Sequence, residues 1–211
     1  MKDSHLTTQN VTRAPLSKRS LLCIAHLATC TVLLAAPGES SPAITLRDAT
    51  GVSHTPLAAD ARKATVLLFF MHDCPVANAT SPAIARLAAD FGPRGCKFFG
   101  VYATETAQEI TTHRTDFKLP FPGLLDPQCQ LARHVGATRV PEAAILSPTG
   151  KLLYRGRIDD RATQPGSLKP QPSREDLRLA LEAILAGKPA ESQITEAIGC
   201  YIPIPATPTK P

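Results

Sequence analysis

The chain is organised around one stretch, Thr65-Val66-Leu67-Leu68-Phe69-Phe70-Met71-His72-Asp73-Cys74-Pro75. Its apolar residues run without interruption from Val66 to Met71, which is typical of a strand buried on both faces in the middle of a sheet. Pro75 suits the first position of a helix, where its missing N–H needs no partner. The stretch therefore predicts a buried strand, a short turn and a helix that begins directly after Cys74.

This position predicts that Cys74 is a reactive thiol. The unpaired N–H groups and the positive end of the helix dipole would favour its thiolate form, which is the nucleophilic form of cysteine. Asp73 would oppose this effect, because a second negative charge next to the thiolate is unfavourable. The alternative is a buried structural cysteine. We interpret Cys74 as the nucleophile.

Patterns typical of strands and helices alternate around this stretch. Strands are predicted at 43–46, 52–57, 97–102, 143–146 and 152–155, and helices at 75–91, 104–117, 127–134 and 173–186. Thr104 is the predicted N-cap of the second helix, and Ser173 with Asp176 a capping box for the last. Residues 120–123 are interpreted as a turn and 158–172 as a loop. This order predicts an α/β fold, a central mixed sheet with helices on both faces, preceded by an N-terminal β-hairpin.

The first 38 residues have the features of a signal peptide or N-terminal anchor. Basic residues precede an uncharged apolar run, residues 21–36, and small residues follow it. The run is shorter than the about 20 residues of a typical membrane span. We expect an exported protein, periplasmic or otherwise extracytoplasmic, that contacts a membrane only through residues 21–36 if they are not removed. The remaining chain is predicted to form one domain, 39–188, and a tail, 189–211, that carries Cys200.

Charge does not favour a nucleic-acid partner. Part of the formal charge of +5 belongs to the leader, and from Glu39 onward 19 basic residues face 17 acidic ones, a net charge of +2. No cluster of Lys and Arg with interleaved aromatic residues is present in the sequence. We expect no nucleic-acid partner.

Export would leave four cysteines in the mature chain: Cys74, Cys96, Cys129 and Cys200. Four cysteines in an oxidising compartment allow three connectivities, among which the sequence does not choose. Cys96 and Cys129 are interpreted as small buried side chains. Cys200 lies in a tail without clear periodicity and could move, as a resolving thiol must. A bond between Cys74 and Cys200 would be either exchangeable or a permanent staple.

Four features resemble a known superfamily. They are the strand-turn-helix that ends at Cys74-Pro75, Pro82 within the following helix, the step Val140-Pro141-Glu142 before a strand, and the closing strand Tyr154 to Asp159. Together they resemble the thioredoxin-like superfamily, and within it the exported redoxin and TlpA-like branch related to the AhpC/TSA group. The resemblance covers about residues 42–188 and implies a thioredoxin-like fold.

The resemblance also implies roles for site residues. Cys74 takes the place of the nucleophilic cysteine, and Pro141 that of a cis-proline that faces it. Asp73, Pro75, Arg139 and Val140 are the implied substrate contacts, with a substrate chain pairing as an added strand beside Pro141. The ending Thr195-Glu196-Ala197-Ile198-Gly199-Cys200-Tyr201-Ile202 is similar to that of a subset of single-thiol redoxin proteins. It suggests that Cys200 is brought back towards Cys74.

The sequence also departs from these families. Ala77 stands where thioredoxins keep a second cysteine, so no disulfide can close within the active-site turn. Leu67 and Met71 stand where peroxiredoxins place Pro and Thr or Ser, so the groups that would polarise a peroxide are not in register.

We therefore predict a thiol-disulfide oxidoreductase without a cofactor, in which Cys200 or an external thiol resolves a mixed disulfide at Cys74. Its partners would be protein thiols or disulfides, or a peroxide, and an external thiol reductant. One alternative is a thiol peroxidase that forms a sulfenic acid at Cys74. Another is a non-catalytic copper-binding or docking module that uses His72, Cys74 and Cys200 as ligands. His113 and His134 are interpreted as surface residues.

Overall fold

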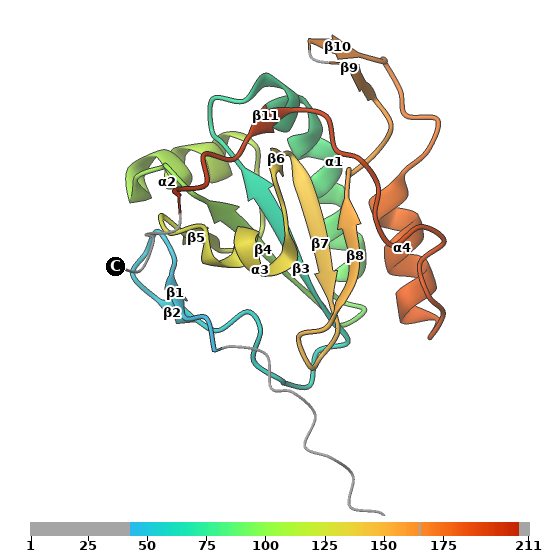
Figure 1. The fold of residues 1–211 in the computed structure, drawn as a ribbon, viewed down its shortest axis with the longest axis horizontal. Helices are drawn as coiled ribbons and strands as arrows, with labels where there is room; N and C mark the ends of the chain where they lie inside the picture. Colours follow the sequence, from blue (N-terminus) through green and yellow to red (C-terminus); the bar gives the residue numbers. More distant parts are fainter. Residues whose placement is uncertain (1–42, 165, 207–211) are drawn as a thin grey trace, which may run out of the picture. The chain divides into compact units, whose positions relative to one another are not determined.

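A five-stranded mixed sheet forms the centre of this computed structural model, which describes residues 43–164 and 166–206 (Figure 1). The strand order is β5-β4-β3-β7-β8. The strands are β3 (Ala64–Phe70), β4 (Cys96–Tyr102), β5 (Gly123–Leu125), β7 (Glu142–Leu146) and β8 (Leu152–Gly156). The central strand β3 runs parallel to β4 and antiparallel to β7, and all seven of its residues are buried. The predicted buried strand is confirmed.

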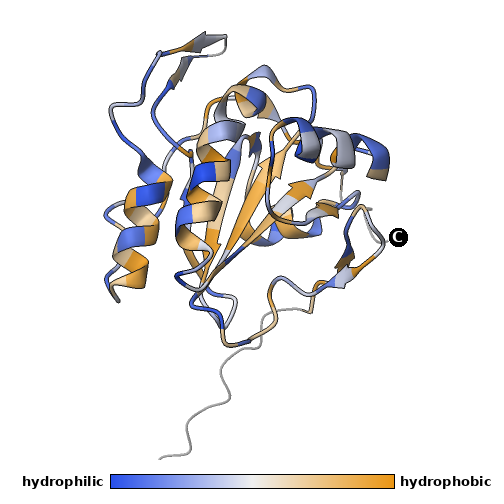
Figure 2. Ribbon diagram, turned by 180° about the vertical axis from the view of Figure 1, so that it is seen from behind, coloured by the Kyte–Doolittle hydropathy of each residue, from blue (hydrophilic) through white to orange (hydrophobic). Residues whose placement is uncertain are grey.

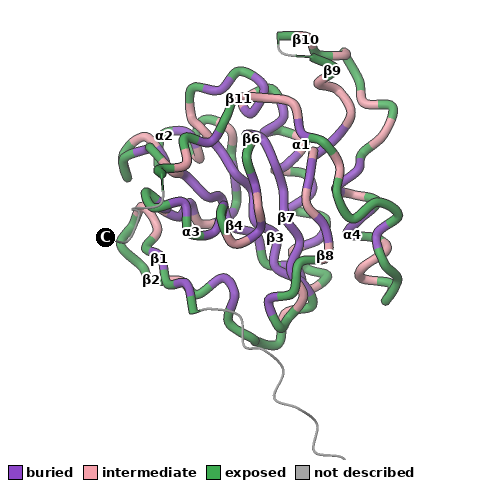
Figure 3. The backbone as a smooth tube through the Cα atoms, in the orientation of Figure 1, coloured by how far each residue is buried: buried purple, intermediate pink, exposed green. Residues whose placement is uncertain are grey.

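Helices cover both faces of the sheet, as predicted. They are α1 (Pro75–Phe91), α2 (Ala107–Asp116), α3 (Gln130–Val135) and α4 (Asp176–Leu185). Figure 2 shows α1 in front of the apolar strands with α4 beside it, whereas α3 lies on the opposite face, which is turned to the viewer in Figure 1. The buried residues gather in the strands of the sheet and on the helix sides that face them (Figure 3). The fold is thioredoxin-like, with a mixed α/β core.

Among the described residues, six short strands lie outside the central sheet, and four of them form two hairpins. The predicted N-terminal hairpin is present but shorter than expected, with β1 (Leu46–Arg47) antiparallel to β2 (Ser53–His54). A second small hairpin, β9 (Ala162–Gln164) with β10 (Ser167–Leu168), interrupts the region predicted as a loop. The predicted turn at 120–123 also continues directly into β5. These strands have two or three residues each, too few for a periodic pattern to reveal them.

Two predicted helix caps are wrong. Helix α2 is capped by Thr106, whose hydroxyl accepts from the backbone N–H of Glu109 while the Glu109 carboxylate accepts from the N–H of Thr106. Thr104 lies outside the helix. The expected capping box of α4 does not form, because Glu175 is the N-cap and the carboxylate of Asp176 instead binds Arg157. Several residues near a helix start can cap it, and tertiary contacts decide which one does.

The predicted leader, residues 1–38, lies outside the described residues, as do Cys23 and Cys30. Within the part of the chain that the structure describes, no helix is long and apolar enough to cross a membrane.

The turn between β1 and β2 predicts a local sensitivity to acid. Asp48 is partly buried, which favours its neutral form, but hydrogen bonds from Thr50, His54 and Val52 outweigh burial and lower the pKa of Asp48 from 3.8 to about 2. A depressed carboxyl pKa gives stability that is present above pH 4 and is lost as the pH falls towards 2. The free energy of unfolding should fall between pH 5 and pH 2, and we expect this fall to be smaller in Asp48→Asn than in the wild type by on the order of 1–2 kcal/mol. Thermal unfolding of both proteins across this range measures it, and an unchanged pH profile would contradict the assignment.

Candidate functional site

Cys74 lies at the junction of β3 and α1. It is the N-cap residue of α1, its side chain makes no capping hydrogen bond, and Pro75 is the first helical residue. The predicted start of the helix is confirmed. Cys74 is only 1% exposed, although both of its chain neighbours, Asp73 and Pro75, are exposed. The side chain of Cys74 is therefore covered and packs with the apolar core, although it lies between two exposed residues.

The segment before β7 faces this sulfur. The Val140–Pro141 peptide bond is cis, as the resemblance implied, and the Cys74 thiol donates to the carbonyl oxygen of Val140 at 3.6 Å. Glu142, which is 4% exposed, holds the segment from within. Its Oε2 accepts hydrogen bonds from the backbone N–H groups of Thr138 at 2.9 Å and Arg139 at 3.0 Å. This buried carboxylate fixes the backbone against which Cys74 packs, a role that the sequence analysis did not identify.

The C-terminal tail pairs with the same segment. Strand β11 (Cys200–Tyr201) is antiparallel to β6 (Arg139–Val140), with Cys200 opposite Val140, and Figure 1 shows the red tail returning from α4 to β6. This register places the sulfurs of Cys200 and Cys74 2.7 Å apart, with the Cys200 thiol donating. Both are free thiols, and their separation exceeds the about 2.05 Å of a disulfide bond. The tail thus occupies the backbone edge at which a substrate strand was predicted to pair.

Side chains hold the tail in this place. The guanidinium of Arg139 lies 3.4 Å above the centre of the Tyr201 ring and donates to the Tyr201 hydroxyl at 2.7 Å. The N–H of Ile202 donates to the carbonyl of Thr138 at 3.0 Å, and the Ile202 side chain is buried. Arg139, predicted to contact substrate, contacts the tail in this state.

Two glycines allow the tail to approach so closely. A Cβ on Gly199 would overlap the carbonyl oxygen of Val140, and a Cβ on Gly156 would overlap Thr195. The hydroxyl of Thr195 in turn lies 2.8 Å from the hydroxyl of Tyr154. Gly156 also has a φ of +153°, which other residues rarely adopt. Thr195, Gly199 and Cys200 therefore each have a role in the docking of the tail.

The surroundings of Cys200 keep it protonated in the resting state. Burial raises the pKa of the Cys200 thiol to about 11, and its hydrogen bond to Cys74, the charge of Cys74 and the charge of Asp73 act in the same direction. Two of these causes originate from Cys74 itself. A reaction that removes the charge of an ionised Cys74 would therefore lower the pKa of Cys200.

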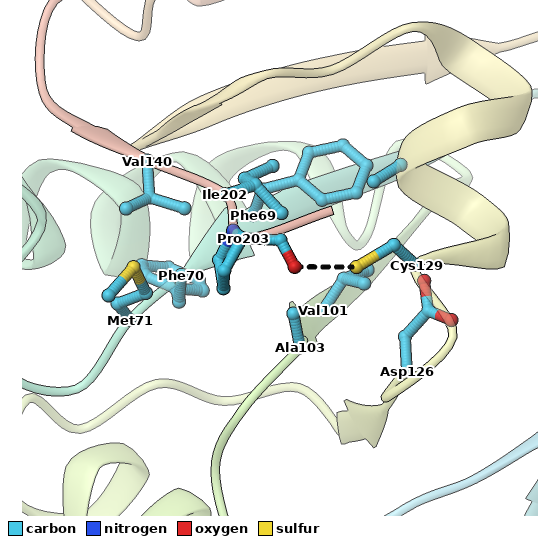
Figure 4. A pocket seen from close by; sticks show the side chains of 11 residues that line it. Phe69, Phe70, Met71, Val101, Ala103, Asp126, Cys129, Val140, Ile202 and Pro203 are labelled. Carbon is cyan, nitrogen blue, oxygen red and sulfur yellow. Dashed lines mark hydrogen bonds between the residues drawn. The ribbon is translucent and has the colours of Figure 1, made fainter. Parts of the chain in front are cut away.

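The other two described cysteines are not at this site. Cys96 pairs with Ala64 at the start of β3, the end of the strand opposite to Cys74. Cys129 lies beneath the tail, where its thiol is 4.0 Å from the carbonyl of Pro203, beside a cavity of about 10 Å³ (Figure 4). Burial raises the pKa of both thiols. Buried thiols of this kind are unreactive.

His72 does not turn towards the sulfurs. Its Nδ1 lies 3.5 Å from the carboxylate of Glu105, whose side chain is 1% exposed. Among the described residues, no group of three or more His, Cys, Asp or Glu side chains is arranged to hold a metal ion. His72, Cys74 and Cys200 are thus not gathered around a common point in the described part of the chain.

A hydrogen-bonded network extends from this region into the core. The amide N–H of Asn78 donates to the carbonyl of His72, and its Oδ1 accepts from Nε2 of His113, whose Nδ1 lies 2.8 Å from the Tyr102 hydroxyl. His113 is 3% exposed, so its interpretation as a surface residue is wrong. Burial lowers the pKa of His113. The neutral imidazole links α1 to α2 and has no contact with either sulfur in the hydrogen bonds of the structure.

Comparisons with known proteins agree with this fold. The model of the AhpC/TSA family matches residues 37–155, more than half of the chain. A hypothetical protein from Sinorhizobium meliloti 1021 is 26% identical, with a TM-score of 0.68 over 78% of this chain and 92% of that chain. An uncharacterized conserved protein from Geobacillus kaustophilus is 28% identical, with a TM-score of 0.66 over 82% and 93%. None of the curated proteins matches the sequence.

Proposed function

The chain belongs to the AhpC/TSA family, and from this premise we propose that it is a thiol oxidoreductase whose redox-active pair is Cys74 and Cys200. One observation carries the proposal: the two sulfurs lie 2.7 Å apart, one at a helix N-terminus and the other on a strand paired with the segment facing it.

The reaction follows from the order in which the thiols become reactive. The Cys74 thiolate attacks one sulfur of a disulfide, the S–S bond breaks, and the other half leaves as a thiolate. The charge on Cys74 is now gone, so two of the causes that raise the pKa of Cys200 are removed. The Cys200 thiolate then attacks the sulfur of Cys74, forms the Cys74–Cys200 disulfide and releases the second thiolate. Two equivalents of an external thiol return the protein to the dithiol and leave as their disulfide.

Mapping the disulfides tests this pair. The reduced protein is oxidised with a small disulfide, alkylated and analysed by mass spectrometry. We expect a Cys74–Cys200 peptide in the wild type, and in Cys200→Ser a trapped mixed disulfide at Cys74. The Cys96→Ser protein is the matched control and should behave as the wild type. A linkage to Cys96 or Cys129, or no linkage with any oxidant, would refute the proposal.

The second step should depend on pH. When Cys74 carries a thionitrobenzoate group, attack by Cys200 releases the coloured thiol. Because only the Cys200 thiolate attacks, the rate should rise by about tenfold per pH unit at pH values below the pKa of Cys200. Asp73→Asn should speed the release at neutral pH, since the charge of Asp73 helps to raise that pKa. A rate independent of pH would contradict this order of events, and Cys200→Ser, which should release nothing, is the control.

Export remains part of the proposal. It is supported by the basic residues, the apolar run 21–36 and the small residues that follow it. We expect the protein recovered from the periplasm of a bacterial host to begin near residue 39. N-terminal sequencing or intact mass measures this, and a full-length cytoplasmic product would contradict it.

A further inference from the structure

The strand edge beside Cys74 is already occupied. An extended polypeptide that delivers a disulfide to Cys74 would pair with β6, because backbone pairing aligns its cysteine with the nucleophile. In this structure Cys200 holds that position opposite Val140, and Tyr201 lies opposite Arg139. A polypeptide substrate and the tail therefore compete for one set of backbone groups.

Displacing the tail requires many contacts to break together. Beyond the Arg139–Tyr201 stacking and the buried Ile202, the tail is held upstream of Cys200. Thr195 donates its backbone N–H to Arg155 at 3.0 Å, and Arg155 donates to Gln193 at 2.8 Å. The tail is thus an ordered part of the domain.

A small molecule needs far less movement. Cys74 is covered by the half-buried side chain of Cys200 and flanked in sequence by the exposed residues Asp73 and Pro75. Rotation of the Cys200 side chain about χ1 moves its sulfur away without breaking the strand pairing. Such rotamer changes take place on fast timescales. We therefore expect the docked tail to obstruct a pairing strand more than a small disulfide, for which only the Cys200 side chain has to move.

We infer that the docked tail selects the oxidising substrate by size, so that Cys74 reacts with small disulfides and rejects polypeptide disulfides. The inference rests on the proposed Cys74–Cys200 pair. With a small disulfide the electrons follow the two exchange steps described above.

The test compares oxidants on the wild type and on two variants whose tail is released. Gly199→Ala introduces a Cβ where the Val140 carbonyl lies, and Ile202→Ser removes a buried apolar anchor. Val52→Ala, at an exposed position between β1 and β2, is the matched control. The oxidants are hydroxyethyl disulfide and insulin, whose disulfides link polypeptide chains. The readout is the rate of Cys74 oxidation under each, measured by alkylation and mass spectrometry.

We expect the ratio of the insulin rate to the hydroxyethyl disulfide rate to rise at least about tenfold in both variants, as expected from the loss of one or more tail contacts. The control should keep the ratio of the wild type. Alkylation of Cys129, which lies beneath Pro203 of the tail, reports tail release independently of activity, and circular dichroism reports that the variants are folded.

Two outcomes would overturn the inference. One is an unchanged ratio although Cys129 becomes accessible, and the other is continued protection of Cys129 in both folded variants, which would mean that these contacts do not hold the tail. If no oxidant forms the Cys74–Cys200 bond, the proposed function itself fails. Fast oxidation of the wild type by insulin is a different result, which would contradict only the selection by size.

Discussion

Replacing Cys74 with serine should reduce turnover of a small disulfide to the uncatalysed rate, a loss of at least about 100-fold, because positioned reacting groups reach effective molarities far above those in solution. The serine hydroxyl is nearly isosteric but is not ionised at neutral pH, so the helix N-terminus holds no nucleophile. Cys200 remains in this variant, but its pKa is raised by burial, and no second thiol lies beside it to complete the cycle. The measurement is the steady-state reduction of hydroxyethyl disulfide with dithiothreitol as the reductant.

Comparison with Cys200→Ser separates attack from resolution. That variant should still react once, and it should then accumulate as a mixed disulfide until an external thiol releases it. Cys129→Ser is a matched control, because Cys129 is equally buried but lies beneath the tail and away from Cys74. If Cys74→Ser retained turnover while Cys129→Ser lost it, the nucleophile would be Cys129 and the assignment of Cys74 would be wrong.

Replacing Glu142 with leucine should lower the free energy of unfolding by about 3 kcal/mol, the cost of leaving buried donors without a partner. The change removes the acceptor of the Thr138 and Arg139 N–H groups and the carboxylate 3.4 Å from Nε of Arg155. It should also loosen the β6 edge on which the tail docks, so closure of the Cys74–Cys200 disulfide should slow.

Glu142→Gln is the matched control, because its amide oxygen can still accept from the two N–H groups. We expect it to cost about 1 kcal/mol, the net value of one typical interaction. Urea unfolding measures the free energy of unfolding of the three proteins, which should decrease from the wild type to Glu142→Gln and then to Glu142→Leu. Equal stability of the Leu variant and the wild type would mean that the buried carboxylate does not support β6.

The local order of elements near Cys74 was predictable from the sequence. The apolar run ending in Cys74-Pro75 specifies a buried strand and a helix start through short-range rules of periodicity and backbone geometry. Pro141 was predicted as cis only through the resemblance, since a lone X-Pro step is cis in only about 5% of cases. Short strands such as β5 and the caps of α2 and α4 were missed or misplaced, because their residues gain their partners from distant segments.

The sequence by itself determined the strand, the turn, the helix start and the presence of a thiol there, since each depends on neighbours a few residues away. Only the tertiary structure decided what lies against that thiol. Cys200 is 126 positions further along the chain, and its place depends on a two-residue strand, the missing side chain of Gly199 and the stacking of Arg139 on Tyr201. Such contacts arise when segments far apart in sequence pack together, and no local pattern encodes their register.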